Sequence, residues 1–359
     1  MNTVETSRNG ITNVIFNNIC AMDKSGLQID FVSINQPEPL YVDTISQIGG
    51  EVYVLPRTRK SIIKYWLGLQ NLIRKKAYDI VHIHGNSHTT VLELIAIRLA
   101  GCGVGMVHAH TTTCDHVVAH RLLTPVFNRL CTHRVACGKA AGDFMYDKAP
   151  FFVINNGIDT QRFAFDASMR KSVRNNLGLS DEYKLIGHVG YFLAVKNQSF
   201  LVEVFQKLYQ KNTKYRLLLI GDGEQREQVE TKIANLSLSD FVILTGGIDN
   251  VSDYLNAMDI VVMPSLYEGL PLALIEQQAN GLHCVVSDSI TKEVDKTGNM
   301  DFLPLSWSAA KWADYIDHCS ISSERKQQSD DAIAKIKTIG YDIQTEAEKL
   351  RKLYLSIGS

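Results

Sequence analysis

The sequence predicts an α/β protein made of two doubly wound, Rossmann-like domains. Its 359 residues are too many for one ordinary hydrophobic core, which favours two domains. Short β-branched runs alternate with longer segments of helical periodicity, and this alternation restarts near residue 180. We therefore expect one domain over residues 1–160 and a second over residues 161–338. A C-terminal helix within residues 339–359 is expected to pack back toward the first domain.

In the first domain, four runs are typical of strands: "QIDFVSI", "EVYVLP", "DIVHIH" and "GMVHAHT". Helical spacing appears in "SIIKYWLGLQNLIRKK" and in "TTVLELIAIRLAG", which Gly101 ends. A doubly wound domain normally opens with an apolar strand, a glycine turn and a helix. Only "MNTV" precedes the turn and helix of "SRNGITNVIFNNICAM". We therefore expect a first strand that is missing or very short, and a natural chain start upstream of Met1.

The second domain has near-continuously apolar strands, which indicate a parallel sheet covered on both faces. These strands are "YKLIGHVGYF", "YRLLLIGDG", "FVILTGG", "DIVVMPS" and "LHCVVSD". The helices expected between them are "NQSFLVEVFQKLYQKN", "EQREQVETKIANL", "VSDYLNAM" and "PLALIEQQANG". The last amphipathic helix is "IQTEAEKLRKLYLSIGS".

Composition excludes several classes of protein. With 45% hydrophobic and 21% charged residues, the chain is typical of soluble globular proteins. No apolar run approaches the roughly 18 residues of a membrane span, and the start lacks the layout of a signal peptide. The 7 cysteines are scattered without a Cys-x-x-Cys pair, which suits reduced thiols in a cytoplasm. The net charge of −1 gives no argument for nucleic acid as a partner.

Candidate binding residues follow the strands of the second domain, because ligands of open α/β sheets bind at the carboxyl ends of strands. Glycines, helix N-termini and Lys196 in "GYFLAVKN" describe a cradle for a phosphate-bearing ligand. The alternative is that Lys196 is an ordinary exposed lysine. "GDGEQR" lacks the third glycine of the dinucleotide fingerprint and is weak evidence for NAD.

The segment "YEGLPLALIEQQANG" contains two carboxylates and a helix start. Pro271 suits the first turn of a helix, so the amides of Gly269 and Leu270 would lie at its N-terminus, where a phosphate can dock. Glu268 precedes this helix and Glu276 lies within it, on an otherwise apolar face. A buried carboxylate needs hydrogen-bond donors, and sugar hydroxyls are such donors. A local cap or salt bridge for Glu276 is equally compatible with the spacing.

Taken together, these segments resemble the family-4 retaining glycosyltransferases. "SLYEGLPLALIEQQANGLHCVVSD" looks like their E-x7-E signature, and "DIVHIHGN", "MVHAHTT", "VINNGIDTQRF", "VGYFLAVKNQSFLVEVF" and "LLLIGDGEQREQVE" agree in order along the chain. The resemblance covers essentially the whole chain. It implies the GT-B fold, two Rossmann-like domains facing across a cleft, and it is strongest to bacterial capsular and exopolysaccharide enzymes.

The resemblance also implies roles for individual residues. Glu276 would accept hydrogen bonds from a nucleotide ribose, and Glu268 would contact the donor sugar. His110 would lie near the reacting centre as a neutral imidazole. The residues carried over for the diphosphate or its surroundings are Gly10, Gly190, Lys196, Gly269 and Leu270. The family usually has an arginine directly after the glycine of "VG", and this chain has Tyr191 there.

The implied activity is transfer of a sugar from a nucleotide-diphosphate sugar to a saccharide or lipid-linked saccharide, with retention of configuration. A UDP-sugar is the expected donor. The resembling enzymes need no cofactor or metal, and no Asp-x-Asp motif at a strand end contradicts this. Surface polysaccharide biosynthesis is the expected role. Two alternatives stay open: a nucleotide-sugar-binding subunit with little activity, suggested by Tyr191 and the missing or very short first strand, and a sugar-nucleotide epimerase.

Two further features invite separate hypotheses. Seven histidines and Cys114 fall between residues 82 and 120, which suggests zinc. The simpler interpretation is that one member of each pair, His82/His84 and His108/His110, reaches a cleft while the others pack.

Residues 57–76 form a basic segment with Tyr65 and Trp66 among aliphatics, and residues 121–134 could extend it. Such a helix can lie on an anionic membrane surface, or it can simply pack on the sheet with a basic outer face. We expect a cytoplasmic protein that can lie on the inner face of the membrane.

Overall fold

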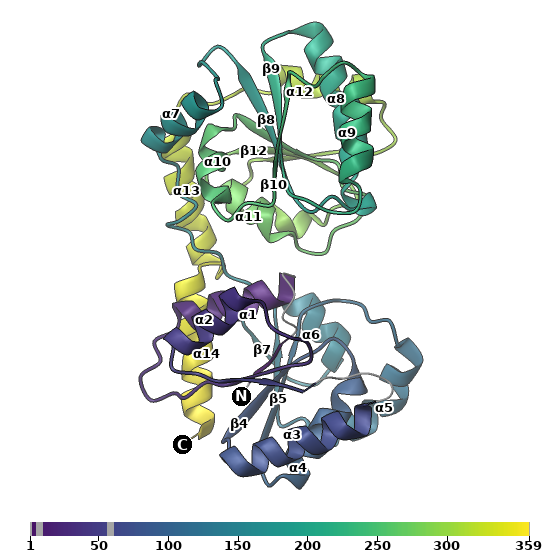
Figure 1. Ribbon diagram of the computed structural model, residues 1–359, viewed down its shortest axis with the longest axis vertical. Helices are drawn as coiled ribbons and strands as arrows, with labels where there is room; N and C mark the ends of the chain where they lie inside the picture. The colour runs from purple at the N-terminus through teal and green to yellow at the C-terminus, as the bar shows by residue number, and fades with distance from the viewer. Residues whose placement is uncertain (1, 5–9, 56–60, 359) are drawn as a thin grey trace. The chain divides into compact units, whose positions relative to one another are not determined.

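The computed structural model describes residues 2–4, 10–55 and 61–358. The chain divides into two compact units, residues 1–157 with 340–359, and residues 158–339. Each unit contains one parallel sheet with helices on both faces (Figure 1), which confirms the predicted α/β fold class.

The first unit has a seven-stranded sheet in the order β3-β2-β1-β4-β5-β6-β7. The strands are β1 (Asn2–Val4), β2 (Phe31–Ser33), β3 (Val52–Val54), β4 (Ile80–His84), β5 (Val104–Ala109), β6 (His133–Ala136) and β7 (Phe152–Val153). β1 is very short, as predicted, yet it pairs in parallel with both β2 and β4 and so occupies the interior of the sheet. The direction of the strand order reverses there, between β1 and β4.

Helices cover both faces of this sheet. α1 (Gly10–Ala21), α2 (Pro39–Gln47) and α14 (Ile343–Gly358) share one core, which includes Phe16, Ile45 and Leu350. The opposite face is covered by α3 (Ile62–Lys76), α4 (Val91–Leu99), α5 (Val117–Leu130) and α6 (Lys139–Tyr146), with a short 3₁₀ turn η1 (His88–Thr90) before α4.

The C-terminal helix α14 is joined to the end of the first unit's sheet. The backbone nitrogen of Asn155 donates to the carboxylate of Glu346 over 2.7 Å, and the Asn155 side chain donates to the carbonyl of Gly340 over 2.9 Å. A Cβ atom on Gly157 would lie 2.8 Å from the Cα of Ile343, so the two backbones touch. The chain therefore leaves the first unit and re-enters it at neighbouring points.

The second unit has a six-stranded sheet in the order β10-β9-β8-β11-β12-β13. The strands are β8 (Lys184–Val189), β9 (Tyr215–Ile220), β10 (Val242–Gly246), β11 (Ile260–Met263), β12 (His283–Ser287) and β13 (Met300–Leu303). The order reverses between β8 and β11, and such a switch point is where open α/β sheets bind ligands.

On one face of the second sheet, α8 (Gln198–Lys211), α9 (Arg226–Asn235) and α12 (Ala309–His318) pack around the buried Trp312. Four other helices pack in two pairs. α7 (Ala167–Asn176) contacts α10 (Val251–Ala257), and α11 (Leu272–Ala279) contacts α13 (Arg325–Thr338). Short 3₁₀ turns occur at η2 (Ala194–Lys196) and η3 (Lys292–Val294).

Arg325 fixes the C-terminal ends of α10 and α11. Its guanidinium is buried, and it donates to the carbonyl oxygens of Leu255 at 2.7 Å, Asn280 at 3.2 Å and Met258. Burial lowers the pKa of Arg325 to about 9, and the partial negative charge of these helix ends favours its cationic form. A single side chain thus holds α11 from the end opposite to its N-terminus.

No helix among the described residues is both long and apolar enough to cross a membrane. The seven cysteines form no disulfide.

Candidate functional site

The switch point of the second unit lies between the loops that follow β8 and β11. The backbone nitrogen of Leu266 donates to the carbonyl of Val195 over 2.7 Å, and the side chain of Asn197 donates to the carbonyl of Pro264 over 3.1 Å. Asn197 has a φ of 57°, in the left-handed region that asparagine tolerates better than most residues. These contacts fix the two loops to each other at the carboxyl edge of the sheet.

Lys196 and Glu268 meet at this place. The Lys196 Nζ lies 2.6 Å from a Glu268 carboxylate oxygen, and the two side chains are 18% and 12% exposed. A Cβ atom on Gly190 would lie 3.7 Å from Cδ and Cε of Lys196, so the backbone after β8 runs close beside the methylene carbons of this side chain. The structure therefore brings together three of the residues named from the sequence.

Glycines allow the loops after β8 and β9 to touch. A Cβ atom on Gly221 would lie 2.0 Å from the carbonyl oxygen of Gly190, and Gly221 has a φ of 141°. A Cβ atom on Gly223, at a φ of 151°, would lie 2.6 Å from the carbonyl oxygen of Phe192. Only glycine fits these two positions, because no other residue tolerates both the conformation and the close approach.

The start of α11 offers two backbone donors. Pro271 precedes the first helical residue, and Gly269 and Leu270 stand directly before it, next to the parallel bridge that Glu268 forms with Ile290. Gly269 is exposed. Backbone amides at a helix N-terminus, together with the helix dipole, attract anions. α11 begins at Leu272, four residues after Glu268, so its N-terminus follows closely on the Lys196–Glu268 pair.

Glu276 lies about one turn into α11 and is partly buried. Its carboxylate has no hydrogen-bond partner among the described residues, so the local cap or salt bridge considered for it is not made in this structure. Burial raises the pKa of Glu276 to about 7, while the positive charge of Arg162 opposes this shift. A carboxylate in this position can accept hydrogen bonds from a ligand, and doing so would favour its ionised form.

Two residues of this region were not identified from the sequence. Arg162, whose Nη2 donates to the carbonyl of Asp249 over 2.6 Å, supplies the cation near Glu276. His188 is fully buried in β8, with Nδ1 3.0 Å from the carbonyl oxygen of Val262.

The Nε2 atom of His188 has no partner within the described chain, and it lies 3.5 Å from where a Cβ atom of Gly190 would be. Burial lowers the pKa of His188 to about 4, so the ring is neutral, with a lone pair on Nε2 beneath the loop. A single polar residue inside the apolar run "LIGHVG" was the signal that could have revealed it.

Two predicted residues belong to the first unit. His110 follows β5; its backbone nitrogen donates to Asn86 Oδ1 over 2.9 Å, and its Nε2 lies 2.9 Å from Nδ1 of His84. Burial lowers the pKa of His110 to about 4, which makes the expected neutral imidazole the stable form. Gly10 is the first residue of α1, and the turn expected before it, residues 5–9, lies outside the described residues.

A cavity of about 550 Å³ opens at the carboxyl edge of the first unit's sheet. Its lining is rich in hydroxyl, amide and carboxyl groups, and includes Thr12, Asn86, Thr89, Thr111 and Asp115. Glu93 is buried at its floor and accepts a hydrogen bond from the Tyr65 hydroxyl over 3.2 Å. Such a lining suits a ligand with many hydroxyl groups.

Comparisons with known families match both halves of the chain. Residues 8–162 match the family described as Glycosyltransferase Family 4, and residues 169–328 match the family described as Glycosyl transferases group 1.

Individual relatives agree with these family matches. The putative glycosyltransferase EpsF of Bacillus subtilis (strain 168) is 31% identical over 362 residues, which cover 97% of this chain and 94% of EpsF. The UDP-Gal:alpha-D-GlcNAc-diphosphoundecaprenol alpha-1,3-galactosyltransferase of Escherichia coli is 30% identical over 240 residues, covering 63% of this chain and 62% of that enzyme.

Solved structures show the same fold. HepE of Anabaena, crystallised in complex with UDP, has a TM-score of 0.79 and 16% sequence identity, with 99% of both chains covered. A glycosyltransferase from Rickettsia africae ESF-5 has a TM-score of 0.79 and 16% identity, covering 99% of this chain and 97% of that one. At this level of identity the similarity establishes the GT-B fold and nothing finer.

Proposed function

The chain belongs to the GT-B glycosyltransferases of the family-4 type, and on that premise we propose that it transfers a sugar from a UDP-sugar to a saccharide or lipid-linked saccharide. We place this reaction, with retention of the anomeric configuration, in the biosynthesis of a bacterial capsular or exopolysaccharide. The observation that carries the proposal is the cluster at the second unit's switch point, where Lys196 and the amides of Gly269 and Leu270 surround one helix N-terminus.

The cluster suits a diphosphate. Breaking the bond between the anomeric carbon and the diphosphate oxygen leaves negative charge on the departing group. In this proposal the Lys196 ammonium and the two backbone amides stabilise that charge, and they act through fixed positions rather than through a metal ion. Gly190 allows the backbone to approach the phosphates, and Gly10 is assigned to the same ligand or to the acceptor.

Two carboxylates are assigned to hydroxyl groups. Glu276 accepts hydrogen bonds from the ribose diol, since its carboxylate has no hydrogen-bond partner among the described residues and burial raises its pKa to about 7. Glu268 accepts from hydroxyls of the donor sugar once that sugar displaces Lys196. His110, a neutral imidazole, is assigned to a hydrogen bond with the donor sugar or its phosphate. We assign no enzyme nucleophile.

The acceptor is assigned to the 550 Å³ cavity of the first unit. Its hydroxyl-rich lining and the buried carboxylate of Glu93 match the hydrogen-bonding pattern of a saccharide. The names of relatives support this assignment: one is a galactosyltransferase whose named acceptor is a sugar on diphosphoundecaprenol, and another is an amylovoran biosynthesis glycosyltransferase of Erwinia amylovora. HepE was crystallised with UDP and with UDP-glucose, which supports a UDP-sugar as donor.

A lipid-linked acceptor calls for contact with a membrane, and the first unit has a suitable surface. α3 lies against α4 and α4 against α5 (Figure 1). Their outer faces expose large apolar side chains: Ile63 (72%), Leu67 (51%), Leu99 (54%), Val118 (73%) and Leu122 (75%). Exposed cations lie on the same three helices, at Lys64, Arg74, Arg98, Arg121 and Arg129.

The inner face of α3 packs on the sheet through Tyr65, Leu69 and Ile73, as an ordinary amphipathic helix does. Residues 57–60 of the predicted basic segment lie outside the described residues. Apolar side chains among cations fit an anionic lipid surface, so we propose that this face, named here the α3–α5 face, docks on the bilayer.

The proposed reaction is tested by screening nucleotide sugars for thermal stabilisation and then assaying turnover with lipid-linked acceptors. We expect a UDP-sugar to stabilise the protein and turnover to persist in EDTA. NMR of the product should show a linkage with the same anomeric configuration as the donor. Tight nucleotide binding without turnover would indicate a binding subunit, and a changed donor sugar without acceptor would indicate an epimerase.

The proposed docking is tested by co-sedimentation with vesicles of phosphatidylglycerol and phosphatidylcholine. We expect binding to the anionic vesicles that falls with salt and is lost in Leu122→Glu. The matched control is Ile321→Glu, an exposed apolar residue (44%) of the second unit. Equal binding by both variants would contradict a role for the α3–α5 face.

A further inference from the structure

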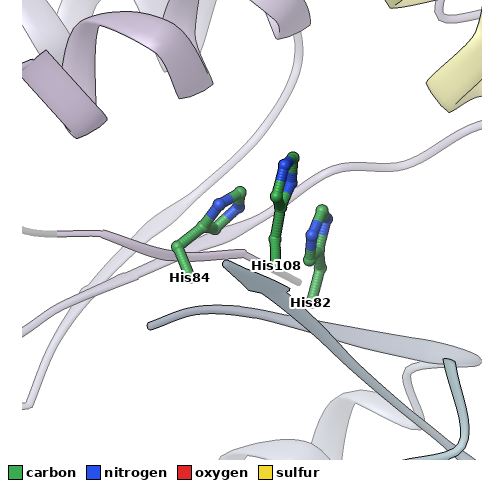
Figure 2. Close-up of side chains that lie close together, drawn as sticks. All are labelled: His82, His84 and His108. Atoms are coloured by element: carbon green, nitrogen blue, oxygen red, sulfur yellow. The ribbon is translucent and has the colours of Figure 1, made fainter. Parts of the chain in front are cut away.

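Three imidazole rings gather at the centre of the first unit's sheet. His82 and His84 come from β4 and His108 from the neighbouring β5, and all three point to the same side of the sheet (Figure 2). The rings of His82 and His108 are parallel, with centroids 5.4 Å apart, and the centroid of His84 lies 4.2 Å from that of His82. One ring nitrogen from each histidine lies within 4.8 Å of the other two. As expected for the His82/His84 pair, His84 lines the cavity at the carboxyl edge of the sheet, while His82 and His108 are buried.

The buried nitrogens of this cluster are poorly satisfied by the protein. His82 is 1% exposed and His108 is 2% exposed. Within the part of the chain that the structure describes, His82 Nε2 and both ring nitrogens of His108 have no hydrogen-bond partner. Each buried polar atom left without a hydrogen bond destabilises the folded protein. A group that bonded to these nitrogens would therefore stabilise the folded unit.

The histidines are present in the form that binds metals. Burial lowers the pKa of His82, His84 and His108 well below the usual range, and nearby imidazoles lower it further. All three rings are neutral at physiological pH, so each carries one nitrogen lone pair. Metal binding would not have to displace a proton from them.

Neighbouring side chains orient the rings. Nδ1 of His82 lies 2.6 Å from the Tyr354 hydroxyl of α14, and Nδ1 of His84 lies 2.9 Å from Nε2 of His110. If these Nδ1 atoms carry the protons, the Nε2 atoms remain as ligands, and hydrogen bonds of this kind commonly support metal-binding histidines. A cavity of about 10 Å³, about the volume that one water molecule needs, adjoins His84 and His108. Asn18 also lines this cavity, and its Oδ1 has no partner among the described residues.

From this arrangement we propose that His82, His84 and His108 bind one transition-metal cation of the Zn²⁺ class. A nitrogen-only ligand set favours Zn²⁺, Cu²⁺, Ni²⁺ or Co²⁺ over Mg²⁺ or Ca²⁺, which prefer oxygen. Zinc–nitrogen bonds of about 2.0–2.1 Å place tetrahedral ligands roughly 3.4 Å apart, so the rings must draw together slightly. Water or hydroxide in the adjoining cavity supplies the fourth ligand, and hydroxide offsets part of the buried charge.

The proposed metal ligands do not include the residues assigned to the donor. One of them, His84, is hydrogen-bonded to His110, which is assigned to the donor. With a cation on Nε2 of His84, the Nδ1–H of His84 donates to Nε2 of His110 and leaves the His110 proton on Nδ1. The ion therefore fixes one tautomer of a residue assigned to the donor. We expect it to modulate turnover without being required for it.

The second unit contains another group of potential ligands, His283, Asp301 and Cys319. Both ring nitrogens of His283 are already bonded there, to Asn299 Oδ1 and Asp301 Oδ2 at 2.8 Å each. This group is therefore satisfied without an ion. It has to be removed from the experiment because it could still bind zinc.

The test uses the full, tag-free, metal-free chain carrying His283→Gln. Titration with Co²⁺ should give a tetrahedral visible spectrum that saturates at one equivalent and is displaced by Zn²⁺, with Kd below about 10 µM, or about −7 kcal/mol. His108→Gln should weaken binding at least tenfold, whereas the matched control His133→Gln, on the neighbouring β6, should not.

X-ray absorption of the zinc-loaded parent gives a readout that does not depend on the folding of any variant. Three imidazole shells at about 2.0 Å support the site. Sulfur or carboxylate ligands, unchanged affinity in a folded His108→Gln, or no binding at 100 µM would each overturn the proposal.

Discussion

The Nζ of Lys196 and a carboxylate oxygen of Glu268 lie 2.6 Å apart, although we assign them to different parts of one ligand. In the free protein each neutralises the other at the switch point of the second sheet. A bound donor must separate this pair, because the diphosphate needs the ammonium group and the sugar needs the carboxylate. The ion pair therefore keeps both side chains in place in the free protein. It also competes with the ligand for the ammonium group and the carboxylate.

Glu268→Gln separates these two effects. Removing the carboxylate frees the Lys196 ammonium group, so we expect the affinity for UDP to rise by about 3- to 10-fold. Turnover of the nucleotide sugar should fall by about 100-fold, because a contact to the donor sugar is lost. Isothermal titration with UDP and steady-state kinetics measure the two quantities.

Lys196→Met is the companion variant, and it should weaken UDP binding by at least tenfold. If both substitutions weakened UDP binding equally, the ion pair would be a purely structural contact.

Tyr191→Arg should raise activity. Tyr191 is 52% exposed and stands where the resembling enzymes carry a cation beside the diphosphate. An arginine there adds a donor for the leaving group, so kcat/KM should rise by about tenfold, equivalent to roughly 1.4 kcal/mol. The control is Leu193→Arg, which adds the same charge at an exposed position two residues further along. An equal gain in the control would show that general attraction of the anionic donor is sufficient.

Glu276 should make donor binding depend on pH. Its pKa of about 7 lies above its ordinary 4.5, so the free protein is largely protonated there below neutrality. Ribose hydroxyls donate to the ionised form. The affinity for the nucleotide sugar should therefore rise as the pH increases toward about 7.5 and level off above it. Glu276→Gln should bind more weakly at pH 8 and show little of this dependence.

The Glu276 carboxyl should also make the stability of the free protein depend on pH. This stability should fall as the pH rises, whereas the affinity for the donor should increase. A carboxyl whose pKa is raised by folding destabilises the folded state as pH rises from about 4.5 through 7. Glu276→Gln should therefore melt about 2 °C or more above the parent at pH 8, with the difference closing near pH 5. Melting curves at the two pH values measure this. A constant difference would show that the carboxyl is not buried in solution.

Gly221→Ala should destabilise the second unit. The new Cβ would lie 2.0 Å from the carbonyl oxygen of Gly190, at a φ that side chains rarely adopt. We expect a loss of about 3 kcal/mol in the free energy of unfolding, together with weaker nucleotide binding as the loop after β8 moves. The control is Gly247→Ala, where nothing lies within 4 Å of the added atom. Similar stability of the two variants would refute the close approach of the loops.

The elements and the outline of the site were predictable where the local signal was strong. The near-continuous apolar runs predicted the strands of the second unit. The segment from Glu268 to Glu276 predicted a helix start at the right place. The sequence could not show that Lys196 pairs with Glu268, because 72 residues separate them and the contact depends on the strand order. Nor could it reveal Arg325, whose partners are carbonyl oxygens rather than residues of opposite charge. The gathering of the histidines likewise required the register of β4 against β5.

The contact between Gly157 and Ile343 has a consequence for how the two units relate as folding modules. Residues 158–339 are one uninterrupted stretch, inserted between two neighbouring points of a unit that is complete only when α14 returns. Excising this stretch and joining residue 157 to residue 340 would leave the first unit with a short bridge rather than a long gap. The second unit is thus an inserted domain within the first. Each unit can be studied as a separate, continuous polypeptide.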